Sequence, residues 1–370
     1  VQQPLRLLPR RGTHVKSNIV KSKGRALPIS LGAIAGGLAL TAAIVHLTTP
    51  RPAALVARSA FKHRRHGKPD DLAQYSLKVQ MRSDIDYQSA FSRGAMDVYC
   101  PIGEPDHAYP VVFWLHGGGY VGGDKHDAAT FCTMLASRGF TVVNVDYAQA
   151  PEFCYPTPVL QLGEAYRYVA AHADRLGADM GRVAFGGDST GGQIAGQFVN
   201  IQVNPEYAQL VSIPASVEDP ASIKAAVFFC TPFNMRRFDY LSNRDGVPAA
   251  SPVPMVGRLA WSYFENRLWR SSDEVRLAGL LDTANEDFPP TYLTDSASFS
   301  FVPQAAEMIS KLKLLDVEVL GYLPGTELGG GKDAAQVRRG LPHNYQYDMK
   351  LPQAFRNFEL ASSFLRDHLR

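Results

Sequence analysis

A serine enclosed by glycines is the first feature of the sequence that could carry chemistry. The segment Gly-Gly-Asp-Ser-Thr-Gly-Gly spans residues 186–192 and directly follows the short apolar run at 183–185. The spacing Gly-x-Ser-x-Gly is typical of a strand that turns sharply into a helix, because only glycine leaves room beside such a bend. In that setting Ser189 is exposed as a nucleophile. The alternative is a chance match within a glycine-rich loop.

A second glycine motif lies upstream, at the end of a predicted buried strand. Residues 111–115 are apolar, and His116 is followed by Gly117, Gly118 and Gly119. Ester hydrolysis needs N–H donors aimed at the oxygen that becomes negative, and losing one donor typically costs roughly 2.7–4 kcal/mol of transition-state stabilisation. Glycine N–H groups can fill this role; the alternative is a flexible turn without chemistry. We interpret His116 as a structural residue whose ring ties the loop down.

A serine nucleophile needs an imidazole to take its proton, and two histidines follow Ser189. His343 lies in the turn-rich segment 340–345, just before the last predicted helix. His368 lies in the last turn of that helix, where a histidine suits the negative helix end. We therefore predict that His343 is the base, with a surface loop histidine as the alternative.

The acid of the predicted triad is the least determined residue. In α/β-hydrolases the order along the chain is serine, acid, histidine. Asp295 follows the predicted strand 291–294 and is the carboxylate of that loop. Its role would be to orient the imidazole without taking the proton itself. The alternative for Asp295 is a turn or helix-capping aspartate, and Asp316 and Asp333 are more remote candidates for the acid.

With these residues in hand, the chain resembles the hormone-sensitive-lipase-like branch of the α/β-hydrolases. Three ordered motifs carry the resemblance, which covers roughly residues 73–370: His-Gly-Gly-Gly at 116–119, Asp-Tyr-Ala-Gln-Ala-Pro-Glu at 146–152 and the serine motif at 186–192. The resemblance implies that the oxyanion donors are the N–H groups of Gly118, Gly119 and Thr190, and that Ser189 and His343 are catalytic.

The chain departs from that family at the acid. Where the family carries an Asp-Pro-Leu-like stretch, this sequence has Ser298-Phe299-Ser300 and no carboxylate. Asp295 is therefore a displaced substitute, or the acid comes from elsewhere in the chain.

Alternating strands and helices predict a mostly parallel sheet covered on both faces, as in the α/β-hydrolase fold. The predicted strands are 75–79, 95–99, 111–115, 141–146, 183–185, 225–229, 291–294 and 317–322; the predicted helices are 128–138, 160–175, 192–201, 304–315 and 354–369. Both glycine motifs then fall at the carboxyl edge of the sheet. The aromatic-rich stretch 231–287 is expected to be a cap over the pocket or an ordinary helical insertion.

Charge is distributed unevenly along the chain. Residues 1–69 hold 13 Lys and Arg and no acidic residue, whereas the remainder carries 25 basic against 35 acidic residues. An acidic body argues against nucleic acid as a partner, while the basic tail suits anionic lipid headgroups. The four cysteines neither pair by spacing nor form a metal-binding pattern.

An uncharged run of 24 residues at 26–49 follows the basic tail at 1–25. About 20 apolar residues suffice to span a bilayer, so we predict a single-pass anchor, with a secretory signal as the alternative. Residues 50–72 would be a basic juxtamembrane linker or helix, and 73–370 the hydrolase domain. Basic residues flank the run almost equally; we expect the tail inside and the enzyme on the extracytoplasmic side.

The sequence thus predicts a membrane-anchored serine carboxylesterase that acts on small to medium acyl esters without a metal or organic cofactor. An amidase or a glycan deacetylase would use the same machinery, and a non-catalytic receptor or scaffold on the hydrolase fold is a third possibility. Nothing in the sequence specifies an oligomeric state.

Overall fold

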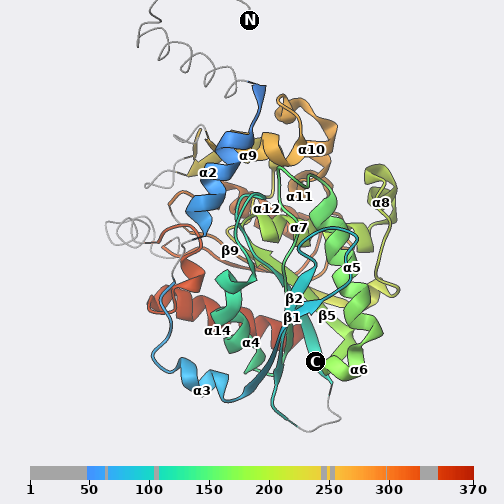
Figure 1. The fold of residues 1–370 in the computed structure, drawn as a ribbon, viewed down its shortest axis with the longest axis vertical. Coiled ribbons are helices and arrows are strands. Elements are labelled where there is room, and N and C mark those ends of the chain that lie inside the picture. Colours follow the sequence, from blue (N-terminus) through green and yellow to red (C-terminus); the bar gives the residue numbers. More distant parts are fainter. Residues whose placement is uncertain are drawn as a thin grey trace, which may run out of the picture. The chain divides into compact units, whose positions relative to one another are not determined.

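The fold is built around one eight-stranded sheet (Figure 1). The computed structural model describes residues 48–62, 66–103, 108–242, 248–250, 255–296, 298–325 and 341–370. The strand order is β1-β2-β4-β3-β5-β6-β9-β10, and from β4 through β10 all neighbours are parallel. The strands are β1 (Val79–Asp86), β2 (Ala95–Pro101), β3 (Tyr109–Leu115), β4 (Thr141–Val145), β5 (Ala178–Asp188), β6 (Ile223–Phe229), β9 (Thr291–Thr294) and β10 (Val319–Tyr322).

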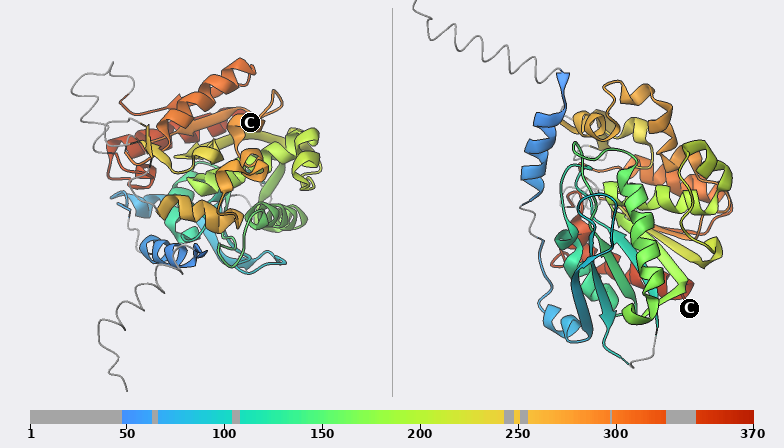
Figure 2. Two further views of the ribbon diagram at one scale, coloured as in Figure 1. Left: turned by 90° about the horizontal axis from the view of Figure 1, so that it is seen from above. Right: turned by 45° about the vertical axis from the view of Figure 1, so that its right-hand side comes forward.

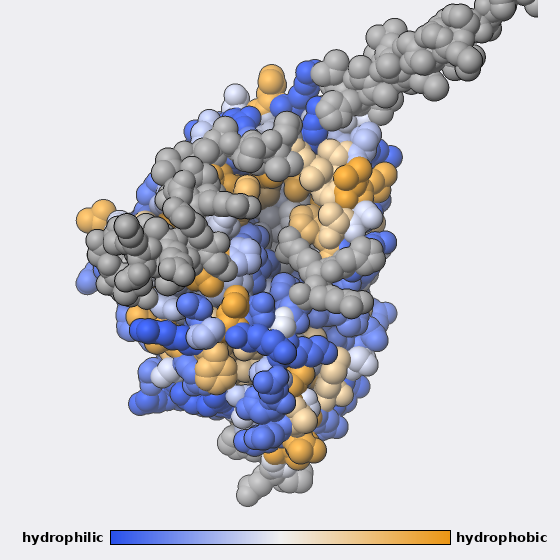
Figure 3. All heavy atoms as spheres, turned by 90° about the vertical axis from the view of Figure 1, so that its left-hand side faces the viewer, coloured by the Kyte–Doolittle hydropathy of each residue, from blue (hydrophilic) through white to orange (hydrophobic). Residues whose placement is uncertain are grey.

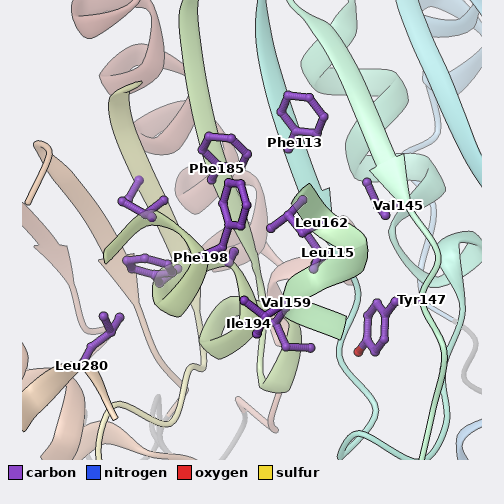
Figure 4. Packing of buried hydrophobic residues seen from close by; sticks show 14 of the residues in the cluster. Phe113, Leu115, Val145, Tyr147, Val159, Leu162, Phe185, Ile194, Phe198 and Leu280 are labelled. Atoms are coloured by element: carbon purple, nitrogen blue, oxygen red, sulfur yellow. The ribbon is translucent and has the colours of Figure 1, made fainter. Parts of the chain in front are cut away.

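Helices cover both faces of this sheet because the side chains of each strand alternate between the two faces (Figure 2). In β3, Val111, Phe113 and Leu115 pack toward α5 (Thr157–Ala171) and α7 (Thr190–Val203), as Figure 4 shows for part of the cluster. Val112 and Trp114 pack on the other face, toward α4 (Ala129–Ala136) and α14 (Pro352–His368). Both faces being buried explains the unbroken apolar run of β3.

The predicted α/β-hydrolase fold is confirmed, and one predicted strand is wrong. Residues 75–79 do not form a strand: α3 (Leu72–Ser76) is helical, and β1 begins only at Val79. Leu72 and Tyr75 are three residues apart, a helical spacing, and Tyr75 packs on the core beside α4. The helix α12 (Val302–Leu314) and the short helices α6 (Ala173–Leu176) and α8 (Pro205–Val211) complete the layers.

Between β6 and β9 the chain forms a mostly helical insertion. It contains the short hairpin β7 (Tyr240–Ser242) and β8 (Pro248–Ala250), followed by α9 (Met255–Phe264), α10 (Asp273–Leu277) and α11 (Leu280–Thr283). Its aromatic residues are largely buried: Phe233, Phe238, Tyr263, Phe264 and Trp269. It coincides with the aromatic-rich stretch 231–287, for which the sequence predicts a cap or an ordinary helical insertion.

The helix α2 (Arg51–Phe61) lies outside the sheet and packs against α9. Its outward face exposes Leu55 and Val56, and Figure 3 shows apolar side chains among polar ones on this side of the molecule. The uncharged run 26–49 lies, except for its last two residues, outside the described part of the chain. None of the helices within the described residues has the length and apolarity needed to cross a bilayer.

Candidate active site

Ser189 lies in a strained turn between the end of β5 and the start of α7. Its backbone has φ 51° and ψ −122°. Residues other than glycine rarely adopt this backbone conformation. The flanking glycines are required sterically. A Cβ on Gly187 would lie 2.4 Å from the Leu115 carbonyl oxygen, and one on Gly191 would lie 2.3 Å from the carbonyl oxygens of Leu115 and His116. The turn thus aims the Ser189 side chain away from the sheet.

The glycine loop after β3 lies directly against this serine. A Cβ on Gly117 would lie 2.9 Å from the Cβ of Ser189. Gly118 has φ +129°, and a Cβ there would lie 1.9 Å from the Gly122 carbonyl oxygen. Gly119 has φ +64°. Side chains are therefore excluded from this loop, and its backbone can approach a substrate bound at Ser189.

Three backbone N–H groups beside Ser189 are available to a ligand. Within the described residues, the N–H groups of Gly118, Gly119 and Thr190 donate to no protein acceptor. Thr190 begins α7, so its N–H is one of the unsatisfied donors at a helix N-terminus, where the helix dipole also favours negative charge. The three groups predicted as oxyanion donors are thus free to bind an oxygen.

The structure brings Ser189 and His343 together, although 154 residues separate them in sequence. The Ser189 hydroxyl lies 3.0 Å from His343 Nε2, within reach for proton transfer. His343 lies in the loop before η5 (Tyr345–Tyr347), at the carboxyl edge of the sheet. The other late histidine, His368, ends α14, where its ring contacts the Phe364 carbonyl.

Asp188, which sequence reasoning did not single out, connects the three segments of the site. Its carboxylate accepts hydrogen bonds from the Gly117 N–H at 2.9 Å, the Tyr347 hydroxyl at 2.7 Å and the Asn344 side-chain amide at 2.6 Å. It is 2% exposed. The residue that precedes the serine therefore fixes both the glycine loop and the histidine loop. Its place inside the serine motif was the only signal in the sequence.

Asp295 lies near His343, but a serine stands between them. The Ser300 hydroxyl donates to Asp295 Oδ1 and lies 3.2 Å from His343 Nδ1. The loop that carries both residues pairs with the histidine loop through Ser298 and Pro342. Complete burial raises the pKa of Asp295 to about 7, against hydrogen bonds from Ser300 and the Ser296 N–H that lower it. Sequence reasoning identified Asp295 and missed Ser300.

The other two carboxylates considered for the acid are placed differently. Asp316 is exposed and precedes β10, so it lies at the amino edge of the parallel sheet, opposite the edge that carries Ser189. Asp333 lies outside the described residues.

Aromatic side chains form a wall beside the serine and histidine. Phe301 meets the His343 ring edge-on, with the ring centroids 6.0 Å apart, and stacks on Phe238. Tyr120, which follows Gly119, stacks on Tyr263 of α9 at 3.8 Å. Leu259 of α9 also lies against the glycine loop, because its Cδ1 is 2.7 Å from the position of a Cβ on Gly119. The insertion between β6 and β9 therefore covers the glycine loop with apolar groups.

The helix α2 contacts the outer side of the glycine loop that follows β3. Arg58 donates from Nε to the Val121 carbonyl and from Nη2 to the Ala150 carbonyl, both at 2.6 Å, and forms an ion pair with Glu152. A Cβ on Gly122 would lie 2.9 Å from the ring of Phe61. Residues of the expected juxtamembrane segment 50–72 thus contact the candidate site directly.

Comparison with known proteins identifies the family of the fold. A family model described as the alpha/beta hydrolase fold matches residues 112–319, more than half of the chain. Esterase LipI of Mycobacterium tuberculosis is 45% identical over 100 residues, which cover 26% of this chain and 31% of the relative. Versiconal hemiacetal acetate esterase of Dothistroma septosporum is 29% identical over 197 residues, covering 52% and 57%. The chain thus aligns with 31% of the length of the first relative and 57% of the length of the second.

Solved structures share the fold over most of the chain. Esterase B from Lactobacillus rhamnosis superposes with a TM-score of 0.64 at 20% identity, covering 91% of this chain and 96% of that one. The carboxylesterase EstE1 from a metagenomic library superposes with a TM-score of 0.59 at 19% identity, covering 88% and 99%. These likenesses extend over the sheet and its helices. The chain belongs to the α/β-hydrolase family, in its hormone-sensitive-lipase-like branch.

Proposed function

We propose that this protein is a serine carboxylesterase that acts on small to medium acyl esters. The observation that carries the proposal is the 3.0 Å contact between the Ser189 hydroxyl and His343 Nε2, beside three backbone N–H groups with no acceptor in the described protein. A nucleophile, a base and donors for a developing oxyanion are the parts that acyl transfer requires.

The proposed reaction follows from these positions. Ser189 Oγ attacks the ester carbonyl carbon while His343 Nε2 takes the hydroxyl proton. The carbonyl oxygen becomes negative and is bound by the N–H groups of Gly118, Gly119 and Thr190. His343 then gives the proton to the leaving alcohol, and an acyl-enzyme remains. A water molecule, activated by the same imidazole, attacks this acyl-enzyme and releases the carboxylic acid.

We assign the orientation of His343 to Asp295, acting through Ser300. For Nε2 to accept a proton from Ser189, Nδ1 of the neutral ring must carry the hydrogen. The Ser300 oxygen can accept that hydrogen because its own proton is donated to Asp295. Asp295 therefore sets the direction of the Ser300 hydroxyl, and the hydroxyl sets the tautomer of His343.

The substrate class rests on the relatives and on the aromatic wall. The two curated relatives named above are called esterases. The apolar groups at the site, Tyr120, Leu259 and Phe301, suit an acyl or alcohol group without charge.

A panel of p-nitrophenyl esters with acyl chains of two to twelve carbons tests the proposal. We expect kcat/KM to be highest for the short and medium chains and hydrolysis to disappear in Ser189→Ala. An anilide of the preferred acyl group serves as the comparison for amide cleavage. Absence of ester hydrolysis across the panel, with the wild-type protein folded, would contradict the proposal.

We propose in addition that the uncharged run 26–49 attaches the enzyme to a membrane. The support is its sequence, which holds no formal charge over 24 residues and is flanked by basic residues on both sides. Extraction of membranes with alkaline carbonate provides the test: an anchored protein stays in the pellet, and a protein released into the supernatant would contradict the proposal.

A further inference from the structure

His116, the residue that opens the glycine loop, places both of its ring nitrogens against acceptors. Nδ1 lies 2.7 Å from the Gly117 carbonyl oxygen, and Nε2 lies 2.9 Å from Asp146 Oδ1. A neutral imidazole has one N–H and can satisfy only one of these contacts as a donor. The side chain is 0% exposed, and in a neutral ring the other nitrogen would hold its lone pair against an acceptor oxygen. Both contacts are satisfied at once only by an imidazolium with two N–H groups.

Asp146 is a suitable counterion for that charge. Its two oxygens also accept from Arg93 Nη2 at 2.8 and 3.0 Å, so the carboxylate is ionised between two donors. Burial by itself would lower the pKa of His116, but the hydrogen bond and charge of Asp146 outweigh burial and raise it. Burial by itself would raise the pKa of Asp146, but His116 and Arg93 outweigh burial and lower it. Both shifts favour the ion pair.

The ring is also held in place by Tyr147. The two rings stack with centroids 4.4 Å apart and planes inclined by 10°. The Tyr147 hydroxyl donates to the carbonyl oxygen of His116 at 2.7 Å. The imidazole therefore cannot rotate to exchange its two acceptors for others.

The contact with Gly117 has a consequence for the oxyanion donors. The Gly117 carbonyl and the Gly118 N–H belong to the same planar peptide group. A charged donor on the carbonyl oxygen draws electron density toward that oxygen and makes the N–H of the same group a stronger donor. The amide on the other side, Gly117 N–H, is held by Asp188. Asp188 thus fixes the preceding peptide group, and His116 polarises the peptide group that carries the Gly118 N–H.

We propose that His116 is a positioning residue that stays protonated throughout the reaction and strengthens the Gly118 N–H as an oxyanion donor. The inference rests on the proposed esterase function. It attributes the strength of the Gly118 N–H as a donor to the buried ion pair between His116 and Asp146. No proton is transferred by His116, because neither of its nitrogens faces the Ser189 side chain.

The charged groups around His116 come from four elements. Asp146 follows β4, Arg93 lies between β1 and β2, Asp127 lies in η1 (Lys125–Ala128), and Asp188 ends β5. Three carboxylates and one guanidinium give a surplus of negative charge, which favours the imidazolium. A histidine with a raised pKa keeps its charge below that pKa and loses it as the pH rises through it. Esterase turnover should therefore decline on the alkaline side when His116 deprotonates.

Nuclear magnetic resonance of the full-length protein with 15N-labelled histidine tests the charge directly. We expect His116 to show both ring nitrogens protonated at pH 7, and its signal to be absent in His116→Gln. Asp146→Asn should lower the pH at which the signal becomes that of a neutral ring. A neutral His116 at pH 7 in the wild-type protein would overturn the inference.

Kinetics with the best p-nitrophenyl ester tests the effect on the oxyanion. His116→Gln and Asp146→Asn should each lower kcat about 5-fold or more with KM changed less than about 2-fold, because the strengthened donor acts mainly in the transition state. The decline of kcat at alkaline pH should shift to another pH in Asp146→Asn and disappear in His116→Gln. Asp124→Asn, in the exposed pair with His126, is the control and should leave kcat and the pH profile unchanged. An active wild type with an unchanged kcat and pH profile in Asp146→Asn would refute this inference and leave the proposed function standing; an inactive wild type would refute the function itself.

Discussion

The carboxylate of Asp188 accepts a hydrogen bond from the side chain of Asn344 at 2.6 Å. Asp188 immediately precedes Ser189, and Asn344 immediately follows His343. The distance between nucleophile and base is therefore supported by a second contact, one residue away on each side. Because the other oxygen of Asp188 holds the Gly117 N–H, the same carboxylate also fixes the glycine loop. One buried side chain thus aligns the serine, the histidine and the oxyanion donors.

Asp188→Asn should lower kcat/KM by about 100-fold, because an amide turns one acceptor into a donor that faces another donor. It should also cost about 1–3 kcal/mol of the free energy of unfolding, as expected when a buried hydrogen bond is left unsatisfied. Steady-state kinetics and urea unfolding measure the two effects. Asp179→Asn, in a half-buried pair with Arg182 at the start of β5, is the matched control and should leave kcat/KM near the wild-type value. If kcat/KM were the same in Asp188→Asn and Asp179→Asn, Asp188 would not align the site.

Asp295 and Ser300 should behave as one unit. If the carboxylate acts on His343 through the Ser300 hydroxyl, then Ser300→Ala disconnects it. We expect Asp295→Asn to lower kcat at least about 100-fold. The double variant Asp295→Asn/Ser300→Ala should have a kcat only slightly lower than that of Asp295→Asn, because the effects of residues acting in series are not additive. A double-variant cycle in kcat measures this coupling.

The corresponding control is Asp333→Asn. Near-normal kcat in Asp295→Asn together with a large loss in Asp333→Asn would move the acid to Asp333. Independent, additive losses in Asp295→Asn and Ser300→Ala would instead show that the hydroxyl does not transmit the effect of the carboxylate.

Burial of Asp295 predicts a specific dependence of stability on pH. The unfolded carboxyl ionises near its ordinary value of 3.8, whereas burial raises the pKa of Asp295 in the folded protein to about 7. Between these values the folded protein holds a proton that the unfolded chain has released, so stability falls as the pH rises from about 4 to about 7. Asn cannot ionise, and Asp295→Asn should therefore gain stability relative to wild type over this range. Urea unfolding of both proteins at pH 4.5 and 7.5 measures the difference; a constant difference would contradict the raised pKa.

Arg58 should matter for turnover although it lies in α2, outside the matched family region and before the first strand. Arg58→Met keeps an unbranched side chain but removes the guanidinium, and with it the bonds to the Val121 and Ala150 carbonyls. We expect kcat/KM to fall by about 10-fold, because the outer side of the glycine loop is no longer fixed. Arg51→Met, at the exposed start of the same helix, is the control and should have no effect. Wild-type kinetics in Arg58→Met would show that the loop holds its shape without α2.

The parts of the site that could be predicted from sequence are those fixed by local sterics. Gly187 and Gly191 mark the serine turn because any side chain there would collide with carbonyl oxygens at the end of the neighbouring strand β3. The loop at His116–Gly119 follows an apolar strand, and the order serine before histidine selects His343. The architecture of a parallel sheet between helices could also be predicted, because helices and strands each have a characteristic spacing of apolar residues.

The parts that were missed depend on contacts between distant segments. Ser300 lies between Asp295 and His343 only because two loops meet at the edge of the sheet, and a lone serine carries no signal of that. Arg58 lies about 60 residues from the Val121 carbonyl that it binds, and its segment was interpreted as a juxtamembrane linker or helix without a contact to the site. Tyr75 was assigned to a strand because apolar and polar residues alternate over 75–79, the period of a half-buried strand.

Mapping of a covalent phosphonyl adduct tests the central claim most directly. The full-length protein is treated with a fluorophosphonate at neutral pH, and the modified peptide is identified by mass spectrometry. We predict a single adduct on the Ser189 hydroxyl, absent in Ser189→Ala and formed at least about 100-fold more slowly in His343→Ala, which lacks the base. An adduct on another residue, or undiminished labelling in His343→Ala, would contradict the pairing of this serine with this histidine.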